Sequence, residues 1–91
     1  MEFEWDERKA ASNLAKHGVS FEQATRAFAD PNAIEYVDDR QDYGEERVIL
    51  IGLAGVVLFV VYTERGARLR IISARRATTH ERQRYYHQVA R

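Results

Sequence analysis

The spacing of hydrophobic and polar residues divides the chain into a helical first third, an extended middle and a helical end. Phe3 to Trp5 alternates in polarity and could form a short strand. Asp6 is a suitable N-cap for a helix running to about His17. Ser20 to Gln23 has the pattern of a capping box that opens a second helix. That helix should end at Asp30-Pro31, because the residue before proline disfavours the helical conformation.

Four strands are expected in the middle of the chain, at residues 33–37, 47–51, 56–63 and 67–73. The polar segment 38–45, the segment Gly52 to Gly55 and the pair Arg65-Gly66 are the predicted turns. Short connections between successive strands favour an antiparallel meander. Thr78 to Glu81 then predicts a capping box at the start of a C-terminal helix. We therefore expect one α+β domain over residues 1–91, with two N-terminal helices packed on a four-stranded antiparallel meander and followed by a helix.

The last predicted hairpin places arginines on the sheet. A two-residue loop at Arg65-Gly66 puts Arg68 opposite Thr63. Cross-strand partners share a face, so Arg68 and Arg70 are expected on one face of the sheet and Arg75 on the other. Arginines that alternate with leucine and isoleucine indicate a face that is either solvated or occupied by a ligand.

Composition narrows the class of protein. A chain of 91 residues has room for one modest core. The absence of cysteine excludes disulfides and cysteine-based zinc sites, and the three histidines lack metal-ligand spacing. The longest apolar run, residues 53–62, is far shorter than the roughly 20 residues that cross a bilayer. The N-terminus has no signal-peptide pattern. We expect a cytoplasmic protein with no membrane contact and no metal or other cofactor.

Charge is divided along the chain although the formal net charge is zero. Residues 1–46 carry twelve acids and five bases, whereas residues 47–91 carry two acids and nine bases, all of them arginine. The planar guanidinium matches phosphate geometry and stacks on bases. The basic half is therefore expected to bind a polyanion, most simply RNA. The alternative is that the two halves attract each other in the folded protein.

Arg75 and Arg76 lie between the last strand and the last helix. A helix N-terminus offers partial positive charge and free N–H groups, so arginines beside it form a plausible phosphate clamp. The alternative is a solvated arginine face that pairs with the acidic half. Lys16 and His17 close the first helix, where a cation is favoured by the helix dipole, but imidazole also serves as a general acid or base.

Aromatic and basic residues are interleaved in the C-terminal helix. Tyr85 and Tyr86 follow Arg82 and Arg84, a combination that can stack unpaired bases. The alternative is that one tyrosine belongs to the core while the other is half exposed.

Two segments of the sequence resemble the BrnT family of bacterial type II toxin–antitoxin toxins. They are Lys16-His17-Gly18-Val19 and Ile72-Ser73-Ala74-Arg75-Arg76-Ala77, and Phe3 to Asp6 and Glu81 to Tyr86 are similar too. The resemblance implies a RelE-like fold and a ribonuclease that arrests translation. It also implies a small antitoxin with a ribbon-helix-helix DNA-binding domain. Toxin and antitoxin would form a hetero-oligomer that contacts operator DNA only through the antitoxin.

A metal-independent ribonuclease of this kind would use the RNA 2′-OH as the nucleophile on the adjacent phosphate. It needs a base, an acid and cations for the charge of the phosphorane. The candidates for proton transfer are Lys16, His17 and Glu64, with Tyr86 as an acid or a stacking residue. The candidates for charge stabilisation are Arg75 and Arg76. RNA binding is expected from Arg68, Arg70, Arg82 and Tyr85.

Two other functions fit the same residues. One is a nucleic-acid-binding module without catalysis, which would bind in a strongly salt-dependent manner. The other is a protein-interaction module that docks an acidic partner on the arginine face.

Overall fold

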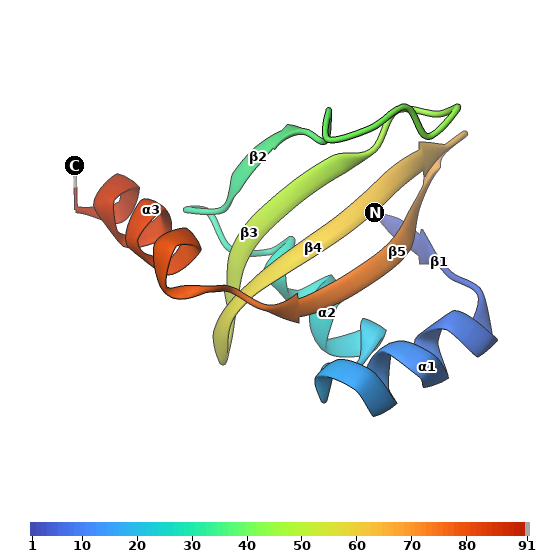
Figure 1. Ribbon diagram of the computed structural model, residues 1–91, viewed down its shortest axis with the longest axis horizontal. Coiled ribbons are helices and arrows are strands. Elements are labelled where there is room, and N and C mark those ends of the chain that lie inside the picture. The colour runs from blue at the N-terminus through green and yellow to red at the C-terminus, as the bar shows by residue number, and fades with distance from the viewer. Residues whose placement is uncertain (91) are drawn as a thin grey trace.

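A computed structural model describes residues 1–90 (Figure 1). The elements follow in the order β1 (Glu2–Glu4), α1 (Glu7–His17), α2 (Phe21–Ala27), β2 (Ile34–Val37), β3 (Val48–Ala54), β4 (Val56–Arg65), β5 (Arg68–Arg76) and α3 (Thr79–Val89). Asp6, Ser20 and Thr78 accept backbone N–H groups as N-caps of the three helices. The α+β class and the three predicted helix starts are confirmed.

The sheet has five strands in the order β1-β5-β4-β3-β2, and it is mixed rather than purely antiparallel. The β2–β5 strands form the expected meander, but β1 adds a parallel edge strand beside Arg68–Arg70 of β5. The predicted meander is therefore present, but the prediction of a RelE-like sheet of only these four antiparallel strands was wrong, because the sheet has a fifth, parallel strand. Short turns dictate antiparallel pairing only between strands that they connect, and β1 is separated from β5 by most of the chain.

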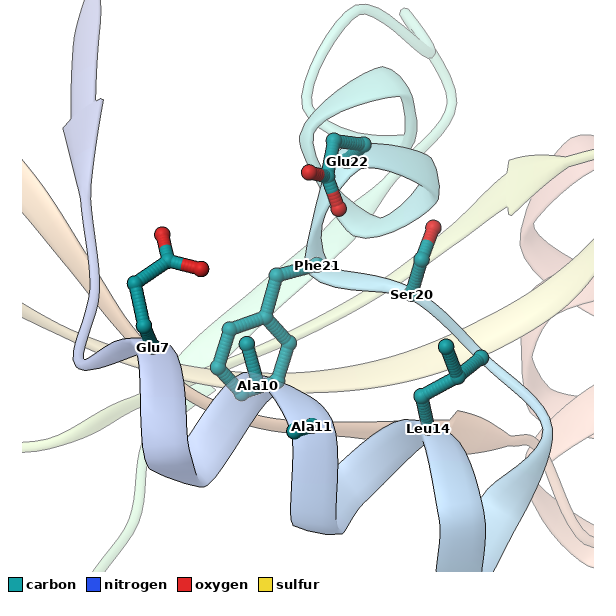
Figure 2. A pocket seen from close by; sticks show the side chains of 7 residues that line it. All are labelled: Glu7, Ala10, Ala11, Leu14, Ser20, Phe21 and Glu22. Carbon is teal, nitrogen blue, oxygen red and sulfur yellow. The ribbon is translucent and has the colours of Figure 1, made fainter.

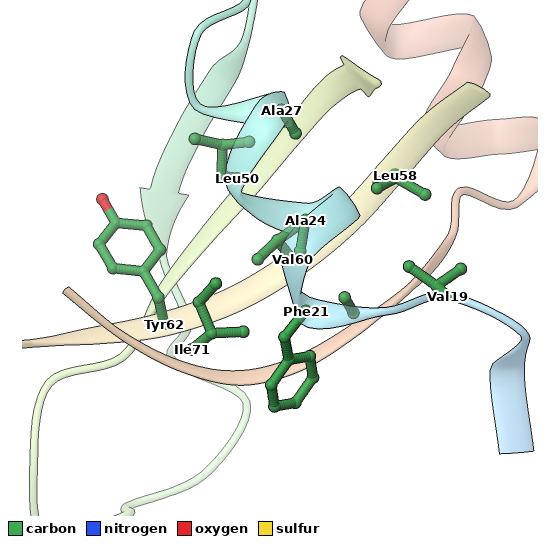
Figure 3. Packing of buried hydrophobic residues seen from close by; sticks show 10 residues of the cluster. Val19, Phe21, Ala24, Ala27, Leu50, Leu58, Val60, Tyr62 and Ile71 are labelled. Atoms are coloured by element: carbon green, nitrogen blue, oxygen red, sulfur yellow. The ribbon is translucent and has the colours of Figure 1, made fainter. Parts of the chain in front are cut away.

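The first face of the sheet, called here the α1/α2 face, carries the larger core. Phe21, Ala24 and Ala27 of α2 pack on alternate residues of β4, Leu58 and Val60 among them (Figure 3). The other face, called here the α3 face, carries a second cluster in which Ile49, Ile51 and Phe59 meet Ala77 and Tyr85. Figure 1 shows α3 apart from α1 and α2, beyond the end of β5. Because β4 is buried on both faces, it is hydrophobic at nearly every position.

A β-bulge in β5 changes the faces predicted for the arginines. The loop is Gly66-Ala67, since Arg65 pairs with Arg68. Tyr62 pairs with Ile71 but Val61 pairs with Ser73, which leaves Ile72 as the extra residue. The alternation therefore shifts by one position. Arg75 pairs with Phe59 and joins Arg68 and Arg70 on the α3 face, contrary to the sequence-based expectation.

The junction of α2 with β3 also differs from the prediction. Gly52 lies inside β3, where a Cβ atom would come within 2.8 Å of the Ala27 carbonyl oxygen. The turn is reduced to Gly55, with a φ of 79°. Gln23 donates to the Ala54 carbonyl instead of completing a capping box with Ser20. Helix α2 ends at Ala27, earlier than the predicted end at Asp30-Pro31. The N–H groups of residues 28–30 donate to the carbonyl three residues before, so this segment forms turns and not a continuation of the α-helix.

The edge of β5 beyond β1 is covered by a side chain of α1. The Asn13 amide donates to the Ala74 carbonyl at 2.7 Å and accepts from the Ala74 N–H at 3.2 Å. It also donates to the Val19 carbonyl at 3.0 Å. Asn13 therefore takes the place of a neighbouring strand and fixes α1 along β5.

Candidate active site on the α3 face

Arginines lie over aromatic rings on the α3 face of the sheet. The Arg75 guanidinium carbon is 4.0 Å from the centre of the Phe59 ring, and that of Arg84 is 5.0 Å from the centre of Tyr36. Cation–π contacts of this length are favourable, and they hold the planar groups in a defined orientation. The α3 face therefore presents a row of ordered cations above a hydrophobic base.

Arg75 is held by a carboxylate at the start of α3. Its Nη1 and Nη2 atoms donate to Oε1 and Oε2 of Glu81 at 2.8 and 3.0 Å. Glu81 also accepts the Thr78 N–H and completes the capping box. Burial alone would raise the pKa of Glu81, but the hydrogen bonds from Arg75 and Thr78 outweigh it and lower the pKa. Glu81 therefore stays ionised and orients Arg75.

Arg68 and Arg70 pair with the acidic residues of β1. Arg70 donates to Glu4 at 2.8 Å, and Arg68 lies 3.8 Å from Glu4 and 3.9 Å from Glu2. The acidic and basic halves therefore do attract each other here, as the alternative interpretation of the charge division proposed. These two arginines are less available for RNA than their position on the strand suggested.

Lys16 and His17 lie in a shallow pocket where α1 meets β5. The pocket is lined by Lys9, Ser12, Asn13, Lys16, His17, Ile72 and Ser73. Ser73 precedes Arg75 by two residues and shares its face of the sheet. Ser73 of the pocket and Arg75 are therefore neighbours along one face of β5.

Two predicted residues direct their side chains to the face opposite Arg75. Glu64 is exposed and pairs with Leu69, on the α1/α2 face. It is five residues from Phe59 on β4, about 16 Å along a strand. Arg76 pairs with Leu58 and is also on the α1/α2 face. The structure brings neither side chain to the place where Arg75 lies over Phe59, called here the Phe59 site.

The tyrosines of α3 have separate roles. Tyr85 is only 2% exposed, and its hydroxyl donates to Asp30. Burial and that hydrogen bond raise the pKa of Tyr85 to about 12. Its burial contradicts the prediction that Tyr85 stacks on RNA and agrees with the alternative of a core tyrosine. Tyr86 is exposed and packs edge-on against Tyr85.

Arg82 lies in the first turn of α3. It donates to the Ala77 carbonyl and to the Thr79 hydroxyl, and its side chain remains on the surface. These bonds place its charge close to the helix N-terminus, beside the strand end that carries Arg75.

The residues that sequence reasoning missed are Phe59, Tyr36 and Glu81. Aromatic residues in strands and a glutamate in a capping box are ordinary structural features, so the sequence does not distinguish these three residues as functional. The β5 bulge turns Arg75 to the face on which Phe59 lies, and no pattern in the sequence marks it.

A second hollow lies between α1 and the start of α2, and Figure 2 shows its lining. It is lined by Glu7, Ala10, Ala11, Leu14, Ser20, Phe21 and Glu22. Its apolar lining and two carboxylates do not suit a polyanion. Within residues 1–90 no cluster of histidine, aspartate or glutamate is arranged to hold a metal ion. Among the described helices, none is long and apolar enough to cross a membrane.

Comparison with known proteins gives the family. Residues 5–81 match the model of the family described as the ribonuclease toxin BrnT of type II toxin–antitoxin systems. The crystal structure of the Brucella abortus ribonuclease toxin BrnT is similar, with a TM-score of 0.66 and 28% identity over 87% of this chain and 99% of that chain. No curated protein matches the chain significantly. The chain therefore belongs to the BrnT family of ribonuclease toxins of type II toxin–antitoxin systems.

Proposed function

We propose that this toxin cleaves RNA internally, without a metal ion, and that the cleavage inhibits translation. The observation that carries the proposal is the Arg75 guanidinium, fixed by Glu81 over Phe59 and connected along β5 to the pocket with Lys16 and His17. An oriented guanidinium at the scissile phosphate stabilises the charge that develops in the transition state. The lysine and histidine supply groups that transfer protons.

The reaction needs no group beyond these side chains and the RNA. The 2′-OH attacks the adjacent phosphorus and loses its proton to a ring nitrogen of His17, which acts as the general base. The bond to the 5′-oxygen breaks, and Lys16, a donor through its ammonium group, protonates that oxygen. The products are a 2′,3′-cyclic phosphate and a free 5′-OH. Arg82 and Tyr86 extend the surface along which the RNA strand lies.

The family implies an antitoxin partner. We propose that this partner carries a ribbon-helix-helix DNA-binding domain and that operator DNA is bound only through the complex. Its acidic residues would compete with RNA for the arginines of the α3 face.

Cleavage of a single-stranded RNA in excess EDTA tests the proposal. Cleavage at an undiminished rate, with 2′,3′-cyclic phosphate ends, is expected. Arg75→Ala should lower kcat at least a hundredfold, because the phosphorane charge loses its main partner. Arg75→Lys should recover little, since an ammonium lacks the planar fork.

The matched control is Arg26→Ala, which removes one exposed arginine from α2 on the opposite side of the sheet. It should cleave like the unsubstituted toxin. Loss of cleavage in EDTA would contradict the metal-independent mechanism. Full activity of Arg75→Ala would remove Arg75 from the site. Binding of RNA without any cleavage would favour a nucleic-acid-binding module.

A further inference from the structure

We propose that Arg40 is a second phosphate-binding arginine of the Phe59 site, holding the RNA phosphate next to the one bound by Arg75. Arg40 lies in the loop of residues 38–47 that connects β2 and β3. The inference rests on the proposed function, and it assigns to this loop the task of holding the substrate strand.

The loop is folded back on the α3 face. The Asp38 N–H donates to the Arg47 carbonyl at 2.8 Å, and the Thr63 hydroxyl donates to the Glu46 carbonyl at 2.7 Å. Arg47 lies over the ring of Tyr43 at 4.1 Å. These contacts position the loop so that the Arg40 guanidinium carbon is 5.6 Å from the centre of the Phe59 ring.

Arg40 is fixed by a buried carboxylate. Its Nε and Nη2 atoms donate to Oδ1 and Oδ2 of Asp38, both at 2.7 Å. The Asp38 side chain is 1% exposed, whereas that of Arg40 is 56% exposed. Tyr43 also donates to Asp38, at 3.1 Å. The exposed member of this pair is therefore an oriented cation, and more than half of its side chain is open to solvent.

Arg75 and Arg40 are arranged in the same way. Each is held by two hydrogen bonds from its guanidinium to one carboxylate, and each lies over Phe59. Since their guanidinium carbons are 4.0 and 5.6 Å from one ring centre, they are no more than 9.6 Å apart. Two oriented cations this close can bind neighbouring phosphates of one strand.

The chemistry favours RNA over an acidic protein segment. The two guanidiniums lie over an aromatic ring, and Arg84 over Tyr36 adds a third such pair on the same face. Two guanidiniums no more than 9.6 Å apart suit a polyanion that carries one charge at every unit, as the phosphate backbone of RNA does.

Steady-state cleavage kinetics of Arg40→Ala, compared with Arg75→Ala, test the inference. A residue that binds a phosphate beside the scissile one should contribute to substrate binding. In Arg40→Ala, KM should therefore rise about tenfold while kcat stays within about twofold of the original value. Arg75→Ala should instead lower kcat. Arg40→Lys should restore part of the affinity, because the charge remains.

Loss of Arg40 leaves the Asp38 charge buried without its main partner, which can destabilise the loop. The double variant Asp38→Asn/Arg40→Ala removes both charges and separates this effect from RNA binding. An RNA with 2′-deoxy substitutions resists cleavage and therefore reports binding alone. The salt dependence of its binding to the double variant should have a slope smaller by about 0.7 than the slope for the unsubstituted toxin. Arg26→Ala is the control for the single variant Arg40→Ala, because both remove one positive charge.

The outcomes separate this inference from the proposed function. If Arg75→Ala abolishes cleavage while Arg40→Ala and the double variant keep the original KM and salt slope, Arg40 holds no phosphate and the inference is overturned. If the toxin binds the RNA but never cleaves it, the proposed function fails, and the salt slope alone still decides on Arg40. Weaker antitoxin binding by Arg40→Ala with unchanged RNA binding would assign the loop to a protein interface and overturn the inference.

Discussion

At the scale of single residues, carboxylates decide which arginines remain available. Glu4 and Glu2 pair with Arg70 and Arg68 at the strand edge, where both partners are partly exposed. Glu81 is largely buried and orients the Arg75 guanidinium, whose side chain is about one third exposed. Arginine–glutamate pairs therefore have two results in this protein: a surface ion pair at β1 and an oriented cation beside Phe59.

The buried Asp38 carboxylate makes a testable contribution to acid stability. The hydrogen bonds from Arg40, chiefly, hold the pKa of Asp38 at about 2, below its ordinary value of 3.8. A lowered folded-state pKa stabilises the protein above the ordinary value, and this stability is lost as the pH falls through 4 towards 2. The contribution is about 1–2 kcal/mol at pH 7, allowing for screening of the exposed Arg40.

Urea unfolding between pH 7 and pH 2 measures this effect. Asp38→Asn should be less stable than the unsubstituted toxin by about 1–2 kcal/mol at pH 7, and the difference should close near pH 2. Asp39→Asn, at the exposed neighbouring position, is the control and should change stability little. A difference that persists unchanged at pH 2 would mean that Asp38 acts through packing and not through its charge.

At the scale of elements, the helices are fixed to the sheet by two close approaches. Asn13 joins α1 to the open edge of β5, and Gly52 lets the end of α2 lie directly on β3. Asp30 then accepts from the Leu53 N–H and from the Tyr85 hydroxyl, which links this junction to α3. The position of α3 matters for the proposed function because Glu81 and Arg82 are part of it.

Gly52→Ala should therefore destabilise the protein by about 1–3 kcal/mol. The added Cβ would lie 2.8 Å from the Ala27 carbonyl oxygen, a backbone atom that cannot rotate away. Thermal and urea unfolding measure the change. Leu53→Ala alters the neighbouring, partly exposed position and should cost clearly less. Equal stability of Gly52→Ala and the unsubstituted toxin would show that the two elements can separate without cost.

At the scale of the whole molecule, positive and negative side chains are distributed unevenly over the surface although the net charge is zero. Strand β1 neutralises one end of β5, whereas Arg40, Arg75, Arg82 and Arg84 remain on or beside the α3 face. The pocket with Lys16 and His17 extends this basic surface around the edge of β5. The α1/α2 side instead carries the apolar hollow with Glu7 and Glu22 (Figure 2).

RNA binding should therefore depend strongly on salt although the protein is neutral. Four arginines that each replace one counterion give a slope of about −2.8 in a plot of log affinity against log salt concentration for single-stranded RNA. Fluorescence anisotropy with the cleavage-resistant RNA, at salt concentrations from about 50 to about 300 mM, measures the slope. A slope near zero would contradict a phosphate-binding α3 face.

The sequence by itself determined the α+β class, the three helices with their caps at Asp6, Ser20 and Thr78, and the meander of β2–β5. These features follow from local rules, since caps, alternation and turn residues act over a few positions. The family resemblance also followed from short segments of sequence, and the match over residues 5–81 confirmed it.

Only the tertiary structure decided which charged residues meet. The bulge at Ile72, which turns Arg75 towards Phe59, arises where β4 and β5 are fitted to each other across the sheet. The parallel pairing of β1, which neutralises Arg68 and Arg70, joins opposite ends of the chain. The fold likewise buries Tyr85, separates Glu64 and Arg76 from Arg75, and brings Arg40 over Phe59. Each depends on contacts between distant segments, which local patterns of polarity and spacing do not encode.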